Sequence, residues 1–352
     1  LDEEAYARGN STYLPRRVIP MLPELLSNGV CSLQEGVNRF VKSAFVRYDN
    51  KGNVVSERFT RSVIRSARRL TYIEAQALID GDIRTALKHS KSEGKYPDGL
   101  AEQLRLMDEL AKIIRQRRLD AGMIVLGLPE VELVYDEAGN VVDAEPEDNA
   151  FTHTIIEMFM VEANEATARL FDAMSLPMIR RIHPDPDAHD VGDLRQFARV
   201  AGYNIPARPS RRELQALLEA VRGKPAQHAV QLEVLRTLSK AEYSPHLIGH
   251  FALASEHYTH FTSPIRRYPD LIVHRALEAY FDAHPQHADH RLPGGGKRKA
   301  LAEMIARDKR VPVTWPGPDE PTPTRGIAAP STSAGSEGTP LANPAPEAPR
   351  GG

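Results

Sequence analysis

Cysteine is almost absent from this chain. Among 352 residues, only Cys31 carries a thiol. One thiol excludes an internal disulfide and a thiolate zinc cluster, and it favours a reducing, cytoplasmic setting with no disulfide partner. Because Cys31 lies among small and apolar neighbours in SNGVCSLQ, we predict that it is a buried, inert thiol.

Long hydrophobic runs are also missing. No segment approaches the roughly 20 consecutive apolar residues that span a bilayer, so no membrane partner is expected. The first residues, LDEEAYARGN, are acidic and polar, which excludes a signal peptide at this end. They contain no initiator methionine and begin as though in mid-helix, which suggests a chain cut from a longer sequence. The 41% apolar and 26% charged content is typical of a soluble globular protein.

A net charge of −2 gives no overall indication of nucleic-acid binding. The arginines are nevertheless bunched. Five lie within Arg58–Arg69, three within Arg115–Arg118, and two are adjacent at Arg266–Arg267. Local basic clefts are compatible with a nearly neutral total.

Composition divides the chain near residue 284. Residues 1–283 have the patterning of an ordered domain. From residue 284 the sequence turns to His, Gly, Lys and Arg, and from Val311 to Pro, Gly, Ser, Thr and Ala. A short helix is possible at Lys299–Arg310. Otherwise this sequence has too few apolar residues to bury for the gain to offset the entropy lost on ordering, so residues 284–352 are predicted to be a disordered tail.

Strands and helices alternate within the ordered part, which indicates a mixed α/β or α+β fold. Turn residues separate strand-like runs into two predicted hairpins, Val41–Tyr48 with Val54–Ile64 and Val131–Tyr135 with Val141–Ala144. Apolar periodicity predicts helices at Ala101–Arg118, Phe151–Met174, Arg211–Val221 and Ala229–Ser239.

The predicted helix Phe151–Met174 is apolar nearly all round, so it should be buried. His153, Glu157 and Asn164 are nevertheless spaced i, i+4 and i+11, which places them on one face. Such a polar stripe must either find partners or face a cleft. A buried hydrogen-bond network and a ligand cleft have equal weight on this pattern alone.

The segment His260–Ala276, HFTSPIRRYPDLIVHRA, is the most informative in the chain. Arg266 and Arg267 follow a Pro264 turn and precede a predicted helix Pro269–Tyr280, whose proline suits a first helical turn. Bidentate guanidiniums near a helix start are suited to a phosphodiester. A surface ion-pair network is an equally good interpretation of the arginine pair by itself.

As a whole, HFTSPIRRYPDLIVHR resembles the signature of the RNB family of exoribonucleases, the ribonuclease II and ribonuclease R group. Further stretches resemble the same family in the same order: Leu1–Leu33, Ser62–Gly81, Arg117–Glu130, His153–Asn164 and Arg181–Pro186. The resemblance implies that residues 1–283 form the greater part of an RNB-type catalytic domain, a mixed sheet with packed helices around an RNA channel. Such a domain degrades single-stranded RNA from the 3′ end to nucleoside 5′-monophosphates.

The resemblance also implies roles for individual residues. Tyr13 matches an aromatic residue that stacks on the 3′-terminal base, and Arg266 matches the arginine that contacts the scissile phosphate. Tyr72 and Glu157 match positions that discriminate ribose from deoxyribose. The expected RNA-binding set is completed by two residues that position the backbone or serve the fold, Arg267 and Tyr268.

Departures from the family limit this expectation. The family holds Mg²⁺ with aspartates upstream of the position of Tyr13, so the ligands are expected outside this chain and no metal ligand is assigned within it. Asp2, Glu3 and Glu4 have no special spacing. Leu126 stands where the family has a second clamping aromatic. We therefore expect an incomplete fragment with weak or no activity; the alternative is a catalytically inactive RNA-binding module of the same fold. Oligomeric state is not predicted.

Two histidine-rich stretches have weaker interpretations. His183–Asp190 is dense in potential ligands but fits a strand-to-helix loop better than a metal site. His250, His257 and His260 would share one face if their segment were helical, and packing or RNA contact is favoured over zinc.

Overall fold

The computed structural model describes residues 1–284, except 15–16, 129–130, 137–138, 147 and 149. The predicted tail, including Lys299–Arg310, lies outside the described residues apart from His284. Among the described residues, no helix is both long and apolar enough to cross a membrane.

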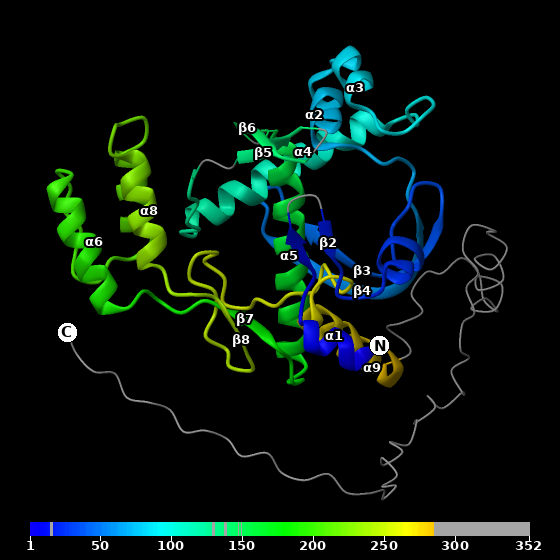
Figure 1. Cartoon of the computed structure of the whole chain (residues 1–352). Coiled ribbons are helices and arrows are strands. Elements are labelled where there is room, and N and C mark those ends of the chain that lie inside the picture. The colour runs from blue at the N-terminus through cyan, green and yellow to red at the C-terminus, as the bar shows by residue number, and fades with distance from the viewer. Residues whose placement is uncertain (15–16, 129–130, 137–138, 147, 149, 285–352) are drawn as a thin grey trace, which may run out of the picture. The chain divides into compact units, whose positions relative to one another are not determined.

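Strands in the described part pair as antiparallel, two-stranded sheets (Figure 1). Both predicted hairpins are confirmed, as the pairs β3 with β4 and β5 with β6. The mixed helix-and-strand class is therefore confirmed, although the strands form separate small sheets rather than one mixed sheet. The strands are β1 (Thr12–Leu14), β2 (Arg17–Ile19), β3 (Asn38–Tyr48), β4 (Val54–Arg65), β5 (Val131–Tyr135), β6 (Val141–Pro146), β7 (Arg180–Ile182) and β8 (Glu242–Ser244).

The predicted helices that fall within the described residues are all present. The hydroxyl of Thr71 caps α2 and that of Ser210 caps α7, each in a capping box with the glutamate three residues later. The helices are α1 (Asp2–Arg8), α2 (Tyr72–Asp80), α3 (Ile83–His89), α4 (Leu100–Asp120), α5 (Phe151–Ala173), α6 (Ala188–Val200), α7 (Arg211–Ala220), α8 (Gln227–Thr237) and α9 (Tyr268–Ala283), with a π-helical turn η1 at Leu25–Val30.

Helix α5 forms the centre of the main core and contacts α2, α4 and β3. Its N-terminal half packs Met158 against Ile114 of α4. Its C-terminal half packs Phe171 against Phe281 of α9 and Phe59 of β4. The burial expected from its sequence is thus real over most of its length, and α5 links the hairpin, α4 and the signature helix α9.

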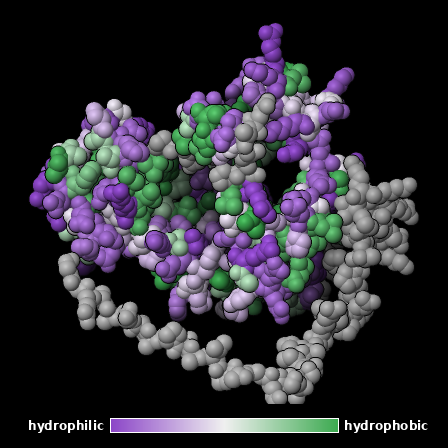
Figure 2. All heavy atoms as spheres, viewed as in Figure 1, coloured by the Kyte–Doolittle hydropathy of each residue, from purple (hydrophilic) through white to green (hydrophobic). Residues whose placement is uncertain are grey.

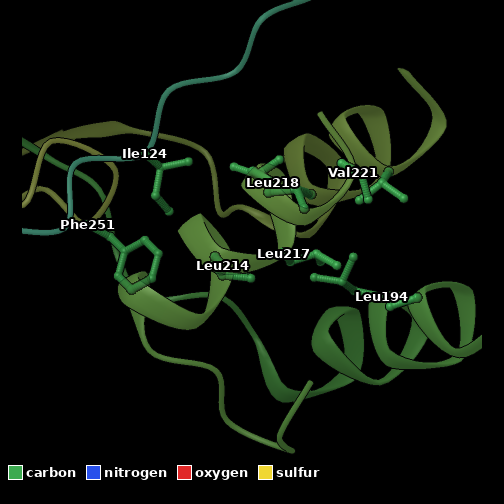
Figure 3. Packing of buried hydrophobic residues seen from close by; sticks show 10 residues of the cluster. Ile124, Leu194, Leu214, Leu217, Leu218, Val221 and Phe251 are labelled. Atoms are coloured by element: carbon green, nitrogen blue, oxygen red, sulfur yellow. The ribbon is translucent and has the colours of Figure 1, made fainter. Parts of the chain in front are cut away.

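A second core lies among α6, α7 and α8. Leu194 of α6 and Leu214 of α7 are fully buried there, and Ile124 and Phe251 pack into the same cluster from outside the three helices (Figure 3). Leu126, where the family has an aromatic residue, packs against this cluster. Its apolar side chain is therefore used in the fold.

Half of the eight arginines in Arg58–Arg69 and Arg115–Arg118 form ion pairs with described residues: Arg61, Arg68, Arg117 and Arg118. Arg117 donates to Glu162 Oε1 at 2.5 Å, Arg118 pairs with the same buried carboxylate, and the hydroxyl of Tyr48 donates to its Oε2 at 2.9 Å. Arg61 pairs with Glu278 of α9 at 2.5 Å. Buried charges are tolerated only when paired. Arg61, Arg117 and Arg118 are thus neutralised within the protein. Hydrophilic residues cover much of the face in Figure 2.

One prediction about the N-terminal region is wrong. Cys31 is exposed, because it follows η1 in a surface loop that contributes no side chain to the hydrophobic clusters of the described residues. Its small apolar neighbours in the sequence do not form a core.

Candidate functional site

The signature segment makes a turn at Pro264–Arg266 and enters α9 at Tyr268. Arg267 is the N-cap of α9. Its Nε and Nη2 donate to the two oxygens of Asp270 at 2.8 and 2.7 Å, and the backbone N–H of Ser263 donates to the same carboxylate at 2.8 Å. Because Asp270 is fully buried, this bidentate pair closes the turn onto the helix start. Arg267 therefore serves the fold.

Arg266, the adjacent residue, is exposed, and no described residue hydrogen-bonds or ion-pairs with its guanidinium. Its backbone is firmly placed. The carbonyl of Arg266 accepts from the N–H of Ser11 at 2.9 Å, and the N–H of Tyr268 donates to Gly9 at 2.8 Å. A β-bridge between Asn10 and Arg267 completes the pairing. The fold thus presents a positioned guanidinium without a charge partner.

Tyr13 lies two residues beyond Ser11, on β1. The main-chain pairing of Gly9–Ser11 with the signature turn therefore brings Tyr13 and Arg266, far apart in sequence, into one region. Tyr13 is 62% exposed and stands opposite Val18 in the hairpin β1–β2. An exposed aromatic ring on a short, paired strand is available to stack on a ligand.

Tyr268 and Asp2 join α9 to α1. The hydroxyl of Tyr268 donates to Asp2 Oδ1 at 3.1 Å, Arg275 pairs with the same oxygen at 2.6 Å, and Tyr6 packs edge-on against Tyr268. The hydrogen bond from Arg275 is the main cause of the lowered pKa of Asp2. Asp2 is thus committed to a cation, and the described residues contain no group of three or more His, Cys, Asp or Glu side chains suited to a metal ion.

Tyr72 and Glu157, two of the predicted site residues, both lie close to His153. The rings of Tyr72 and His153 are stacked, with centroids 3.7 Å apart at 26°. His153 precedes Glu157 by one turn of α5. Glu157 is exposed at the helix surface, and desolvation by the surrounding protein raises the pKa of its carboxyl against the opposing effect of Arg115 and Arg118.

Asn164, the third polar residue of the α5 stripe, has a different environment. It is buried, donates to the hydroxyl of Tyr258 at 3.1 Å, and accepts from the N–H of Phe261 at 2.8 Å. Eleven residues of helix separate it from His153 by about 16 Å. The two interpretations of the stripe therefore apply to different ends: Asn164 belongs to a buried network, and His153 and Glu157 lie at the surface.

The condition under which the three histidines would share a helical face is not met, because residues 250–260 form turns and bridges. His260 accepts from or donates to the hydroxyl of Tyr243 through Nδ1 at 2.7 Å. Burial, reinforced by Arg267 and Arg181, lowers its pKa to about 3. Arg181 lies over the Tyr243 ring at 4.7 Å and has no ion pair with any described residue. Sequence reasoning missed Tyr243, for which no motif gave a signal.

His183 follows β7 in the loop that the sequence predicted. Its Nε2 donates to the carbonyl of Ser239 at 2.6 Å and its Nδ1 accepts from the N–H of Ala252 at 3.1 Å. Both ring nitrogens are therefore used by the backbone, which fixes the neutral tautomer and leaves neither for a metal. The acidic residue Asp187 caps α6 by accepting from the N–H of His189, as expected of a strand-to-helix loop.

Fold and site together define a mixed helix-and-strand domain whose signature turn presents an exposed arginine that has no charge partner among the described residues. The chain belongs to the RNB domain family, whose model matches residues 1–283.

Sequence and structure comparisons agree with this assignment. Ribonuclease R of Aquifex aeolicus is 42% identical over 279 residues, which cover 79% of this chain and 38% of that protein. The apo form of Mycoplasma genitalium RNase R superposes with a TM-score of 0.74 at 29% identity, and the match covers 86% of this chain and 46% of that one. The structure of the same protein in complex with ribose-methylated single-stranded RNA gives the same TM-score, identity and coverage. Yeast Ssd1, a pseudonuclease, shares the fold alone, with a TM-score of 0.58 at 21% identity over 85% of this chain and 35% of Ssd1. The chain spans about two fifths of the length of the curated relatives it matches.

Proposed function

We propose that this chain is the RNA-holding part of a hydrolytic 3′→5′ exoribonuclease that degrades single-stranded RNA to nucleoside 5′-monophosphates. One observation carries the proposal. Arg266, in the family signature, is the exposed member of an arginine pair and has no charge partner among the described residues. The guanidinium of Arg267, in contrast, is hydrogen-bonded to the buried carboxylate of Asp270. A guanidinium held in place by its backbone but lacking a counter-charge favours an anionic ligand.

Each proposed contact follows from side-chain chemistry. Arg266 donates two parallel hydrogen bonds to the scissile phosphodiester, which hold it and stabilise the charge that grows on its oxygens. Tyr13 stacks on the terminal base, a contact that every base can make and that therefore suits a nuclease without sequence preference. Tyr72 and Glu157 bind the 2′-hydroxyl, which both donates and accepts. Arg267 and Tyr268 hold the turn that aims Arg266.

Magnesium is the cofactor that the family resemblance implies, and it would supply a Lewis acid and an activated water. The described residues do not fit it, because they offer no cluster of metal-ligating side chains and Asp2 is bound to Arg275. We therefore assign no metal ligand among the described residues. In this proposal, hydrolysis would require ligands that the described residues do not supply.

A second candidate function is a catalytically inactive RNA-binding module. The same lack of a metal-ligating cluster among the described residues favours it. The fold does not decide between the two, since a pseudonuclease shares it. Both candidates require RNA binding by Arg266 and Tyr13, and they differ only in catalysis.

The test uses the chain with a 3′-tailed, fluorescein-labelled single-stranded RNA. We expect binding that weakens as salt rises, and little or no release of mononucleotides when Mg²⁺ is added. Binding that does not respond to salt, or no binding at low salt, would overturn the proposed function. Robust mononucleotide release with Mg²⁺ would contradict the expected weak or absent activity and would also exclude the inactive module.

A further inference from the structure

His153 is absent from the residues to which the family resemblance gives a role, yet it connects two of them. Its ring stacks on that of Tyr72 at 3.7 Å, a separation shorter than most aromatic pairs adopt. It also lies one turn before Glu157 on α5. No other described ring contacts Tyr72, so His153 is the ring that fixes the orientation of the tyrosine.

The backbone of Tyr72 is held independently of this stack. Tyr72 is the first residue of α2, after the capping box of Thr71 and Glu74, and its carbonyl accepts from the hydroxyl of Thr152 at 2.8 Å. The side chain remains 42% exposed. An exposed tyrosine on a fixed backbone still has rotamers to choose between, and packing against a neighbouring ring is what selects one.

His153 is itself anchored. Its Nε2 lies 3.1 Å from Asp148 Oδ1, and because an ionised carboxylate only accepts, Nε2 carries the proton. Burial alone would raise the pKa of Asp148, but hydrogen bonds from the Ala150 N–H and from His153 outweigh it and lower that pKa. The carboxylate is therefore ionised at neutral pH and holds the imidazole plane against which Tyr72 stacks.

We propose that His153, oriented by Asp148, is a positioning residue for ribose recognition: it fixes the Tyr72 hydroxyl beside Glu157, so that the pair favours a nucleotide with a 2′-hydroxyl. This rests on the proposed function, because it assigns Tyr72 and Glu157 to the sugar. It adds His153 and Asp148, which precedes α5, to the residues that determine the preference for ribose. His153 acts through Tyr72 and does not itself touch the sugar.

The experiment measures the dissociation constants of the chain for matched RNA and DNA oligonucleotides by fluorescence anisotropy. Wild type should prefer RNA. His153→Ala should reduce this preference about fivefold, the effect expected from misaligning one hydrogen bond. His153→Phe keeps the stacked ring and loses the tie to Asp148, so it should retain part of the preference, and Asp148→Ala should resemble it. His228→Ala, an exposed histidine on α8, is the matched control and should change nothing.

A double-mutant cycle with Tyr72→Phe distinguishes positioning from a general structural role. If His153 works by placing the Tyr72 hydroxyl, His153→Ala should lower the RNA preference no further once that hydroxyl is gone. Three results would overturn the proposal: an unchanged preference in His153→Ala, an equal loss of RNA and DNA affinity, or additive effects in the cycle. A wild-type chain that binds neither oligonucleotide would refute the proposed function instead. A wild-type chain that binds RNA and DNA equally would refute only the assignment of Tyr72, Glu157 and His153 to ribose recognition.

Discussion

The adjacent arginines of the signature should behave in opposite ways when each is replaced by alanine. Arg267→Ala removes both hydrogen bonds from a fully buried carboxylate and leaves Asp270 with the Ser263 N–H alone. Breaking a buried pair costs about 3–5 kcal/mol, and because the Arg267 side chain keeps 23% of its exposure we expect about 3 kcal/mol of lost stability. Arg266→Ala breaks no described contact and should change the free energy of unfolding by less than about 0.5 kcal/mol.

RNA binding should show the reverse order. Arg266→Ala should weaken single-stranded RNA binding and lower the slope of log affinity against log salt by about 0.7, the value for one lost phosphate contact. Arg266→Lys keeps the charge and so the slope, but loses the bidentate geometry and part of the affinity.

The two assays are urea unfolding followed by circular dichroism, with the slope m checked for constancy, and anisotropy titrations at several salt concentrations. Equal losses of stability in the two alanine variants would refute the division of roles. So would an unchanged salt slope in Arg266→Ala.

Further predictions concern the aromatic contact, the buried histidines and the internal ion pairs. Tyr13→Ala should reduce the free energy of RNA binding by about 1–3 kcal/mol and Tyr13→Phe by almost nothing, because stacking needs the ring and not the hydroxyl. Titrations with homopolymeric RNAs measure the two affinities, and an equal loss of affinity in both variants would contradict the stacking role. Burial lowers the pKa of His250 and His260 from 6.5 to about 3, so the folded state binds fewer protons than the unfolded state between these values. The contribution of these neutral histidines to stability is therefore complete above pH 6.5 and is lost as the pH falls towards 3. At pH 5 the free energy of unfolding should be lower by about 2 kcal/mol per histidine. Urea melts of wild type and His260→Gln across this range should show a shallower loss in the variant. Glu162→Gln removes the buried carboxylate that Arg117 and Arg118 share and leaves Arg118 with Glu165 as its counter-charge, so it should lower stability by about 3 kcal/mol in the same melts. Glu219→Gln, in an exposed pair with Arg222, should have almost no effect.

Local patterns in the sequence predicted the two longer hairpins and several of the helices. Turn residues between alternating runs predicted β3–β4 and β5–β6, and apolar periodicity predicted α4, α5, α7 and α8 within a few residues of their ends. These signals depend on neighbours in the chain. The pairing of β7 with β8 joins distant segments of three residues each, which are too short to carry a pattern, so it could not be predicted from the sequence.

Charge partners could not be predicted from the sequence. Arg117 and Arg118 belong to the same kind of basic bunch as Arg266 and Arg267, yet both are neutralised by Glu162, which lies on another helix. Burial of Cys31 failed as a prediction for a related reason: a residue's exposure depends on what the rest of the chain packs over it. Spacing placed His250 and His260 on one face only by assuming a helix, which a segment of turns does not provide.

The two adjacent arginines of the signature have different environments, and the proposed function gives each a separate role. A guanidinium that contacts a phosphate must be unpaired in the free protein, and an unpaired, exposed side chain cannot hold its own backbone in place. The adjacent Arg267 supplies that support by binding buried Asp270 across the first turn of α9, and the N–H of Ser11 secures the Arg266 carbonyl from the other side. Our proposal for Tyr72 and His153 has the same form. The Tyr72 ring stacks on that of His153, and the Asp148 carboxylate binds His153 Nε2. In both places the residue that would meet RNA is adjacent to one whose hydrogen bonds are already satisfied within the protein, so the geometry is set before the ligand arrives.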